Sequence, residues 1–190
     1  MVERIRPALA RFDQAEVKLC QALNKIRQRP LLGDLFRLVG RISDGMFWYG
    51  LLVLFPMLYG WAGVWATVHM GIVALVGVAA YKLLKQRATR ERPYITHDSI
   101  DLAGAPLDRY SFPSGHTMHA VAFTMLAAWH VPAWLLPLAA FGVLVALSRV
   151  VLGLHYPTDV IAGGLVGGVL ASASIGIVVF AGRLLAPMLG

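Results

Sequence analysis

The stretch that decides the fold is MFWYGLLVLFPMLYGWAGVWATVHMGIVALVGVAAYKLL, residues 46–84. It contains no Asp, Glu, Lys or Arg before Lys82. A helix needs about 20 consecutive apolar residues to cross a bilayer, so this stretch is long enough for two crossings. We therefore predict two membrane spans that are joined by a tight turn near Gly63.

Three further apolar segments follow this pair. They cover residues 116–131, 133–151 and 158–180. Each is close to the 17–25 residues, roughly, that a membrane helix requires. Hydrophobic residues make up 58% of the chain and charged residues only 14%, whereas a soluble domain is about a quarter charged. The sequence therefore predicts an all-α, polytopic membrane helix bundle of about five spans.

Residues 1–45 differ from the rest of the chain because they are polar and basic. Apolar side chains recur there at steps of three and four residues, which is the pattern of an amphipathic helix. They are Phe12, Ala15, Leu19, Ala22, Leu23 and Ile26. Pro30 ends the pattern, and the apolar run that follows it is too short and too charged to span easily. We predict an N-terminal amphipathic, interfacial helical segment at residues 1–45 and a transmembrane domain at residues 46–190.

The net charge of +7 raises the question of nucleic-acid binding. The sequence has no compact basic run interleaved with aromatic residues, which a nucleic-acid surface would show. In a membrane protein, cations gather instead at the cytoplasmic face and near anionic headgroups. The single cysteine, Cys20, allows neither an intrachain disulfide nor a zinc site of paired cysteines. We expect the lipid bilayer, and no nucleic acid, as the partner.

Reactive side chains concentrate in three short motifs. They are Lys85-x6-Arg92-Pro93, Pro113-Ser114-Gly115-His116 and Ser148-Arg149-x5-His155-x3-Asp159. Counting spans places all three motifs on one side of the membrane. Together they supply what phosphoryl transfer to a histidine needs: cations for the phosphate, a histidine that attacks, a carboxylate that orients it and a second histidine that protonates the leaving oxygen.

The motifs also predict local structure. Ser114 is placed as the N-cap of a helix whose N-terminus suits a phosphate, and Gly115 allows a close backbone approach. Pro157 suits the first position of the last helix because its missing N–H costs nothing there. His155 then lies in the loop before that helix, and Asp159 lies in its first turn.

In order, spacing and residue type, the three motifs resemble the three-part motif of the type 2 phosphatidic acid phosphatase (PAP2) superfamily. The superfamily includes bacterial membrane lipid phosphatases such as undecaprenyl diphosphate phosphatases and phosphatidylglycerophosphatase B. The resemblance implies that His155 is the nucleophile, Asp159 its orienting partner and His116 the general acid. The phosphate ligands that it implies are Lys85, Arg92, Ser114, Gly115 and Arg149. Pro93, Pro113 and Ser148 would support them, and the family mechanism needs neither a metal nor another cofactor.

Other polar residues near the motifs have simpler interpretations. Arg87 and Arg90 are typical of headgroup-facing cations in a juxtamembrane loop. Four residues of the same loop could bind a metal, but a His–Asp pair without a second histidine is a weak pattern. They are His97, Asp98, Asp101 and Asp108.

The resemblance and the apolar composition together predict an integral membrane phosphatase that acts on a lipid phosphate or diphosphate through a phosphohistidine. Undecaprenyl diphosphate is the first candidate substrate, and phosphatidylglycerol phosphate, phosphatidate and lipid A phosphate are alternatives. A vanadate-dependent haloperoxidase is disfavoured by the membrane spans. A non-enzymatic, lipid-binding member is disfavoured by the complete set of catalytic residue types.

Charge and resemblance give opposite predictions for the side of the membrane that carries the site. Every Lys and Arg except Arg183 lies in a segment on the motif side. The positive-inside rule then places the site in the cytoplasm. Family members that recycle undecaprenyl diphosphate usually face the periplasm. We expect the bacterial inner membrane, and both orientations stay open, as does the oligomeric state.

Overall fold

A computed structural model describes residues 2–106 and 108–189, and the side chains of residues 11–106 and 108–186. The elements in chain order are α1 (Val2–Asn24), η1 (Lys25–Gln28), α2 (Pro30–Ile42), α3 (Met46–Arg87), α4 (Pro93–Thr96), α5 (Gly115–His130), η2 (Pro132–Trp134), α6 (Leu135–Val151) and α7 (Pro157–Leu189). Within the described residues, an isolated bridge between Glu91 and Tyr110 is the only β pairing. The predicted all-α class is confirmed.

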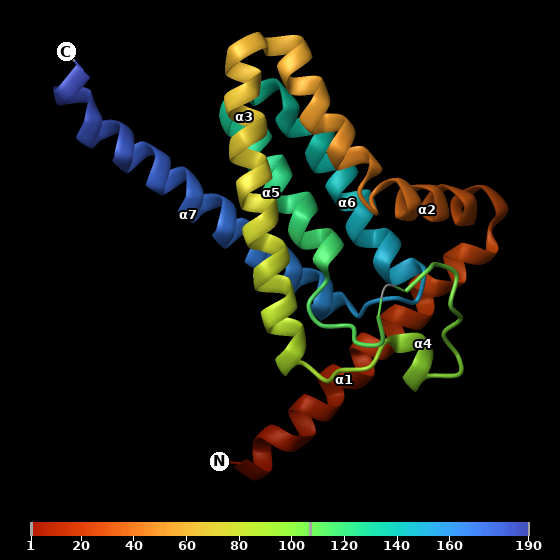
Figure 1. Ribbon diagram of the computed structural model, residues 1–190. Coiled ribbons are helices and arrows are strands. Elements are labelled where there is room, and N and C mark those ends of the chain that lie inside the picture. The colour runs from red at the N-terminus through yellow and green to blue at the C-terminus, as the bar shows by residue number, and fades with distance from the viewer. Residues whose placement is uncertain (1, 107, 190) are drawn as a thin grey trace.

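The long apolar stretch folds as a helical hairpin. Within α3 the backbone leaves helical geometry at Gly60, with φ of 55° and ψ of −130°, and the two arms run side by side (Figure 1). Glycine adopts such a positive φ without steric cost. The turn is therefore at Gly60 rather than at Gly63. Gly63 instead packs closely, because a Cβ on it would lie 2.0 Å from the carbonyl oxygen of Phe55.

Helix α5 occupies the centre of the bundle and packs against α3, α6 and α7. Its buried face includes Phe123, whose ring stacks on Trp48 with 5.0 Å between centroids. Helix α7 approaches α5 through glycines: a Cβ on Gly163 would lie 2.3 Å from the carbonyl oxygen of Ser114. In a bilayer, such close packing and not the exclusion of water holds helices together.

Three helical segments are long and apolar enough to cross a membrane: Met46–Arg87, Pro132–Val151 and Pro157–Ala186. Large apolar side chains face outward from them, including Leu75, Leu136 and Ile177. An apolar surface of this extent needs lipid to cover it. The chain is an integral membrane protein. Because α5 has only 16 residues, the count of five spans stays a prediction.

Helices α1 and α2 lie at one end of the bundle, and α2 runs across it rather than along it (Figure 1). The most deeply buried side chains of α1 are not those of the predicted apolar pattern. They are Glu16, Cys20 and Asn24, each at most 6% exposed, whereas Phe12 is 56% exposed. Leu23 at the end of the pattern packs against the core, but the pattern from Phe12 to Ala22 is exposed. That part of the pattern therefore lies on the outer face of α1, and its location at the membrane interface stays a prediction.

The three motifs meet at one end of the bundle, as predicted. The C-terminal ends of α3 and α6 and the N-terminal ends of α5 and α7 all lie there (Figure 1). The turn at Gly60 and the short η2 lie at the opposite end (Figure 1). Pro157 is the first residue of α7, and His155 lies in the loop before it, as expected.

Candidate active site

His155 lies at the centre of the site and is only 3% exposed. Its Nε2 atom is 3.3 Å from Nη1 of Arg92, and its Nδ1 atom is 3.8 Å from Oδ2 of Asp159. A guanidinium has only donors, so Nε2 must accept and Nδ1 must carry the ring proton. This assignment follows from the partners. It leaves the lone pair of Nε2 on the side of Arg92 and the N–H on the side of Asp159.

The environment of His155 favours its neutral form. Burial is the main reason that its pKa falls from 6.5 to about 4, and the charge of Arg92 acts in the same direction. Asp159 opposes the shift without cancelling it. At neutral pH the imidazole is therefore uncharged, which an attacking nitrogen requires.

Asp159 is fully buried in the first turn of α7. Its Oδ2 accepts a hydrogen bond from the backbone N–H of Tyr156 at 2.8 Å. Its distance of 3.8 Å from Nδ1 of His155 is longer than a hydrogen bond. Within the described residues, that Nδ1 is the one buried side-chain nitrogen or oxygen without a hydrogen-bond partner. The predicted pair is adjacent but not bonded.

Asp159 is held by a residue whose role the sequence analysis missed. Arg90 donates from Nη1 to Oδ1 of Asp159 at 3.1 Å and to Oγ1 of Thr158 at 2.7 Å, and its guanidinium lies 3.7 Å from the ring centroid of Tyr156. The interpretation of Arg90 as a headgroup-facing cation is wrong. Glu16 of α1 in turn accepts from Nη2 of Arg90 at 2.6 Å and from the backbone N–H of Thr158 at 2.8 Å.

The two cations of the first motif are joined by Asp108. Its carboxylate lies 2.5 Å from Nζ of Lys85 and accepts from Nη2 of Arg92 at 2.9 Å. Arg92 also donates to the carbonyl oxygen of Leu154 at 2.9 Å. Burial alone would raise the pKa of Asp108, but the hydrogen bonds from Lys85, Tyr81 and Arg92 lower it below its usual range. Asp108 thus pairs with both cations of the first motif.

The second motif connects to the third through its backbone. Ser114 is the N-cap residue of α5, and its N–H donates to the carbonyl oxygen of Asp159 at 3.0 Å. Its hydroxyl, however, contacts Oγ1 of Thr117 at 3.1 Å and makes no capping bond to the backbone. Gly115 gives room to an aromatic ring, since a Cβ there would lie 3.0 Å from Cε2 of Tyr81.

His116 is paired with a second carboxylate that the sequence analysis did not single out. Its Nε2 lies 2.6 Å from Oδ1 of Asp44, in the turn between α2 and α3. The same oxygen is 3.8 Å from Nη1 of Arg149. Burial acts to raise the pKa of Asp44, but the hydrogen bond with His116 and the charge of Arg149 leave it below its usual value. Arg149 is itself fixed, because Nη2 donates to the carbonyl oxygen of Gly40 and to Oγ of Ser43, both at 3.0 Å.

The remaining predicted residues are structural neighbours of this set. Ser148 is buried, and its Oγ donates to the carbonyl oxygen of Val145 at 2.6 Å while it accepts from Nε of Arg149 at 3.1 Å. Pro93 starts α4, and both it and Pro113 are fully buried. The structure thus assembles the residues of all three motifs and adds Glu16, Asp44, Arg90 and Asp108.

Comparison with known proteins agrees with this arrangement. The family model described as "PAP2 superfamily" matches residues 63–183, which is more than half of the chain. The chain belongs to the PAP2 superfamily. The match contains all three motifs, while Glu16, Asp44 and the first arm of α3 lie before it.

Characterised relatives and a solved structure extend the comparison. The decaprenylphosphoryl-5-phosphoribose phosphatase of Mycolicibacterium smegmatis is 39% identical over 103 residues, 52% of each chain. The undecaprenyl-diphosphatase BcrC of Bacillus subtilis is 35% identical over 104 residues, 54% of this chain and 52% of the relative. The crystal structure of a transmembrane PAP2-type phosphatidylglycerolphosphate phosphatase from Bacillus subtilis superposes with a TM-score of 0.71 at 26% identity, covering 87% of this chain and 85% of that one. The matched region spans about half the length of the two curated relatives.

Proposed function

We propose that this protein is an integral membrane phosphatase that hydrolyses a lipid phosphate or diphosphate through a phosphohistidine intermediate. The observation that carries the proposal is the setting of His155. Its ring is neutral, its Nε2 faces Arg92, and its Nδ1 faces a carboxylate that Arg90 and Glu16 hold in place. A neutral imidazole that is oriented by a carboxylate is the arrangement of an activated nucleophile.

The first half of the reaction forms a bond between Nε2 of His155 and the terminal phosphorus. The bond from phosphorus to the leaving oxygen breaks, and that oxygen takes a proton from His116. Lys85, Arg92 and Arg149 offset the charge on the phosphoryl oxygens. Asp44 contacts Nε2 of His116, so the leaving oxygen either displaces Asp44 or takes the proton from Nδ1.

The second half returns the site to its starting state. A water molecule gives a proton to the now neutral His116 and attacks the phosphorus. The bond from phosphorus to Nε2 breaks, inorganic phosphate leaves, and His155 is again neutral. Asp159 stabilises the transient positive charge on the His155 ring during both halves, because it lies 3.8 Å from Nδ1.

A cavity beside His116 favours a substrate with an apolar chain. It has a volume of about 540 Å³ and lies between the two arms of α3 and α5. Asp44 and His116 are at its polar end, and Trp48, Leu52 and Leu75 are among its apolar lining residues. A lipid whose leaving oxygen reaches His116 could place the start of its chain here without leaving the bilayer.

Undecaprenyl diphosphate is our first candidate substrate. Two relatives carry names that specify polyprenyl phosphates, the decaprenylphosphoryl-5-phosphoribose phosphatase and the undecaprenyl-diphosphatase. Phosphatidylglycerol phosphate, phosphatidate and lipid A phosphate are the alternatives. The first of these has support from the fold similarity to the phosphatidylglycerolphosphate phosphatase. We place the protein in the bacterial inner membrane.

The test is release of inorganic phosphate by the purified protein in a neutral detergent with a chelator present. Undecaprenyl diphosphate, phosphatidylglycerol phosphate, phosphatidate and lipid A phosphate are offered in parallel. We expect release from one class of lipid and none from the His155→Ala protein. His130→Ala is the matched control, since His130 is the last residue of α5 and its ring contacts His69 rather than a residue of the site, and it should keep the activity. Release that persists undiminished in His155→Ala would disprove the phosphohistidine route.

A further inference from the structure

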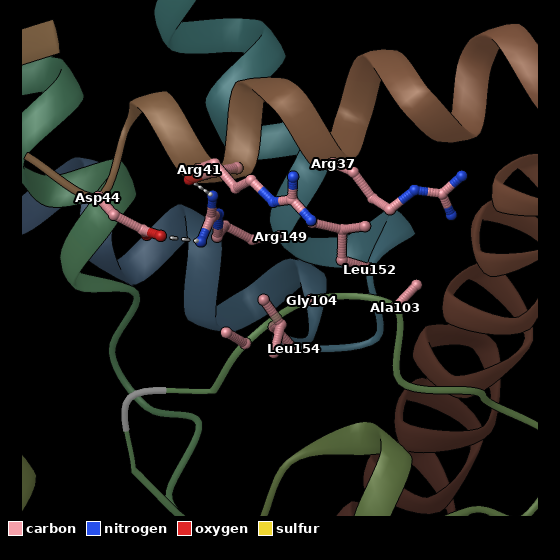
Figure 2. Close-up of a pocket in the computed structure, with 10 residues that line it drawn as sticks. Arg37, Arg41, Asp44, Ala103, Gly104, Arg149, Leu152 and Leu154 are labelled. Atoms are coloured by element: carbon pink, nitrogen blue, oxygen red, sulfur yellow. Dashed lines mark hydrogen bonds and ion pairs between the residues drawn. The ribbon is translucent and has the colours of Figure 1, made fainter. Parts of the chain in front are cut away.

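A second cavity, of about 290 Å³, lies beside the catalytic residues at the junction of α2 with the loop before α5. Figure 2 shows Arg37 and Arg41 on the α2 side, Arg149 and Asp44 at one end, and Leu154 and Gly104 across from α2. The cavity shares Arg149 and Asp44 with the catalytic site, and Leu154 directly precedes His155. It therefore adjoins the catalytic site.

The lining of this cavity is cationic. Three arginines contribute to it, and Asp44 is the one acidic residue among the described lining residues. Asp44 is already engaged with His116 and Arg149. Arg41 is exposed and makes no side-chain hydrogen bond or ion pair with any residue that the structure describes. Arg37 is paired with Asp34 at 2.6 Å, but Asp34 is 74% exposed, so water and a competing anion can replace it.

We propose that this cavity binds a second phosphate group of the substrate, on the leaving-group side of the scissile bond, with Arg41 and Arg37 as its ligands. The inference rests on the proposed function. A guanidinium binds phosphate through two parallel hydrogen bonds, which suits a diphosphate. The uncharged leaving group of a simple monophosphate ester would gain nothing from these two residues.

The position of the cavity supports the leaving-group side. It contains Asp44, the partner of the proposed general acid His116, and the leaving oxygen must reach that histidine. Neither Arg92, which contacts the nucleophile, nor Lys85, which Asp108 joins to Arg92, lines it. Arg149 lines this cavity and is also one of the proposed phosphate ligands of the catalytic site. Its guanidinium can therefore contact both the transferred phosphoryl group and the bridging region of a diphosphate.

The experiment compares two soluble substrates that have the same chain, farnesyl diphosphate and farnesyl phosphate, in a neutral detergent. We expect the wild-type protein to prefer the diphosphate. In Arg41→Gln the kcat/KM for the diphosphate, divided by that for the monophosphate, should fall about tenfold. The fall should come from a higher KM for the diphosphate, because one charge-assisted contact is lost. Activity on the monophosphate should stay within about twofold of wild type. Arg37→Gln should act in the same direction.

Arg29→Gln is the matched control. It removes one exposed arginine from the turn that precedes α2 and leaves the cavity lining unchanged. An equal fall of the ratio in Arg29→Gln would show a general effect of surface charge and overturn the proposal. An unchanged ratio in both Arg41→Gln and Arg37→Gln would also overturn it, while phosphatase activity itself would stand.

A binding measurement keeps the test independent of turnover. Methylenediphosphonate and inorganic phosphate are titrated into the wild-type protein and into Arg41→Gln by calorimetry. We expect Arg41→Gln to lose about tenfold in affinity for methylenediphosphonate and little for phosphate, which needs only the catalytic cations. Equal affinity of both proteins for methylenediphosphonate would refute the second phosphate site even if neither farnesyl substrate were hydrolysed.

Discussion

Replacement of Glu16 by glutamine tests whether α1 is part of the catalytic apparatus. Glu16 is 6% exposed, and its two oxygens accept from Arg90 and from the backbone N–H and hydroxyl of Thr158. Arg90, which Glu16 holds in place, donates in turn to Oδ1 of Asp159 at 3.1 Å. Glutamine keeps the shape of the side chain, but it has one acceptor oxygen and an NH₂ group that can only donate. One of the two sets of donors therefore loses its acceptor.

The size of the effect follows from these contacts. A hydrogen bond to a charged group contributes about 1.5–3 kcal/mol, and Arg90 would keep only Asp159 as a charged partner. Its side chain is 34% exposed, so solvent recovers part of the loss and we expect about 2 kcal/mol of destabilisation. For a protein of this size, that lowers the melting temperature by roughly 4–8 °C. We also expect kcat to fall about tenfold with little change in KM, because Asp159 no longer holds one orientation toward His155.

The assay measures thermal unfolding and phosphate release on the same detergent preparations. Glu91→Gln is the matched control, since Glu91 pairs with Arg109, which is 67% exposed, and such pairs contribute about 1 kcal/mol or less. Arg90→Lys keeps the charge but cannot bridge Glu16 and Asp159, so its kcat should also fall. If Glu16→Gln matched Glu91→Gln in both melting temperature and kcat, the argument that α1 positions Asp159 would be wrong.

Three further predictions follow from single contacts. Burial lowers the pKa of His155 to about 4, so between pH 6.5 and about 4 the unfolded chain binds a proton that the folded one does not. The unfolding free energy should therefore fall by up to about 3 kcal/mol as pH falls through this range, and denaturant titrations of His155→Gln should show a flatter pH dependence. Asp44→Asn should lower kcat by at least about tenfold in the phosphate-release assay, because it removes the carboxylate 2.6 Å from the proposed acid; unchanged kcat would contradict this role. Gly163→Ala should lower the free energy of unfolding by about 1–3 kcal/mol in thermal unfolding, since its Cβ would lie 2.3 Å from the carbonyl oxygen of Ser114. Gly176→Ala is the control and should not lower it, because a Cβ there meets nothing within 4 Å.

The helices of the bundle could be predicted from the sequence because each follows from local chemistry. The apolar runs are continuous, and Pro157 is the first residue of α7, where its missing N–H costs nothing. Ser114 is the N-cap residue of α5, as predicted, although its hydroxyl makes no capping bond. The sequence predicts the turn in α3 near Gly63 and the structure has it at Gly60, because two nearby glycines have the same local preference. Which of them adopts the positive φ depends on packing between the arms: Gly60 meets nothing within 4 Å, whereas Gly63 lies against Phe55.

The face of α1 that enters the site could not be predicted in the same way. Its apolar pattern indicates a face for an apolar environment, and the sequence holds no sign of what the polar face contacts. That face buries Glu16 and Asn24, and Asn24 donates to the carbonyl oxygens of Asp101 and Val151, far away in the sequence. Such contacts depend on the tertiary arrangement of loops, which no spacing rule describes. The role of Arg90 could not be predicted for the same reason, because its partners come from α1 and α7.

Each of the two histidines of the site lies beside a carboxylate that an arginine contacts. Only one of the two carboxylates, Asp159, could be predicted from the sequence. His155 lies beside Asp159, which Arg90 holds, and His116 lies beside Asp44, which Arg149 approaches at 3.8 Å. Asp159 is only four residues after His155, in the first turn of the helix that follows it, so the pair is visible within one motif. Asp44 precedes α3 and His116 lies in the first turn of α5, and they meet only because the α3 hairpin returns the chain to the same end of the bundle. The site therefore depends on the turn at Gly60 as much as on the motifs: a change that shifted the register of the two arms would separate the proposed acid from its carboxylate and leave every motif residue in place.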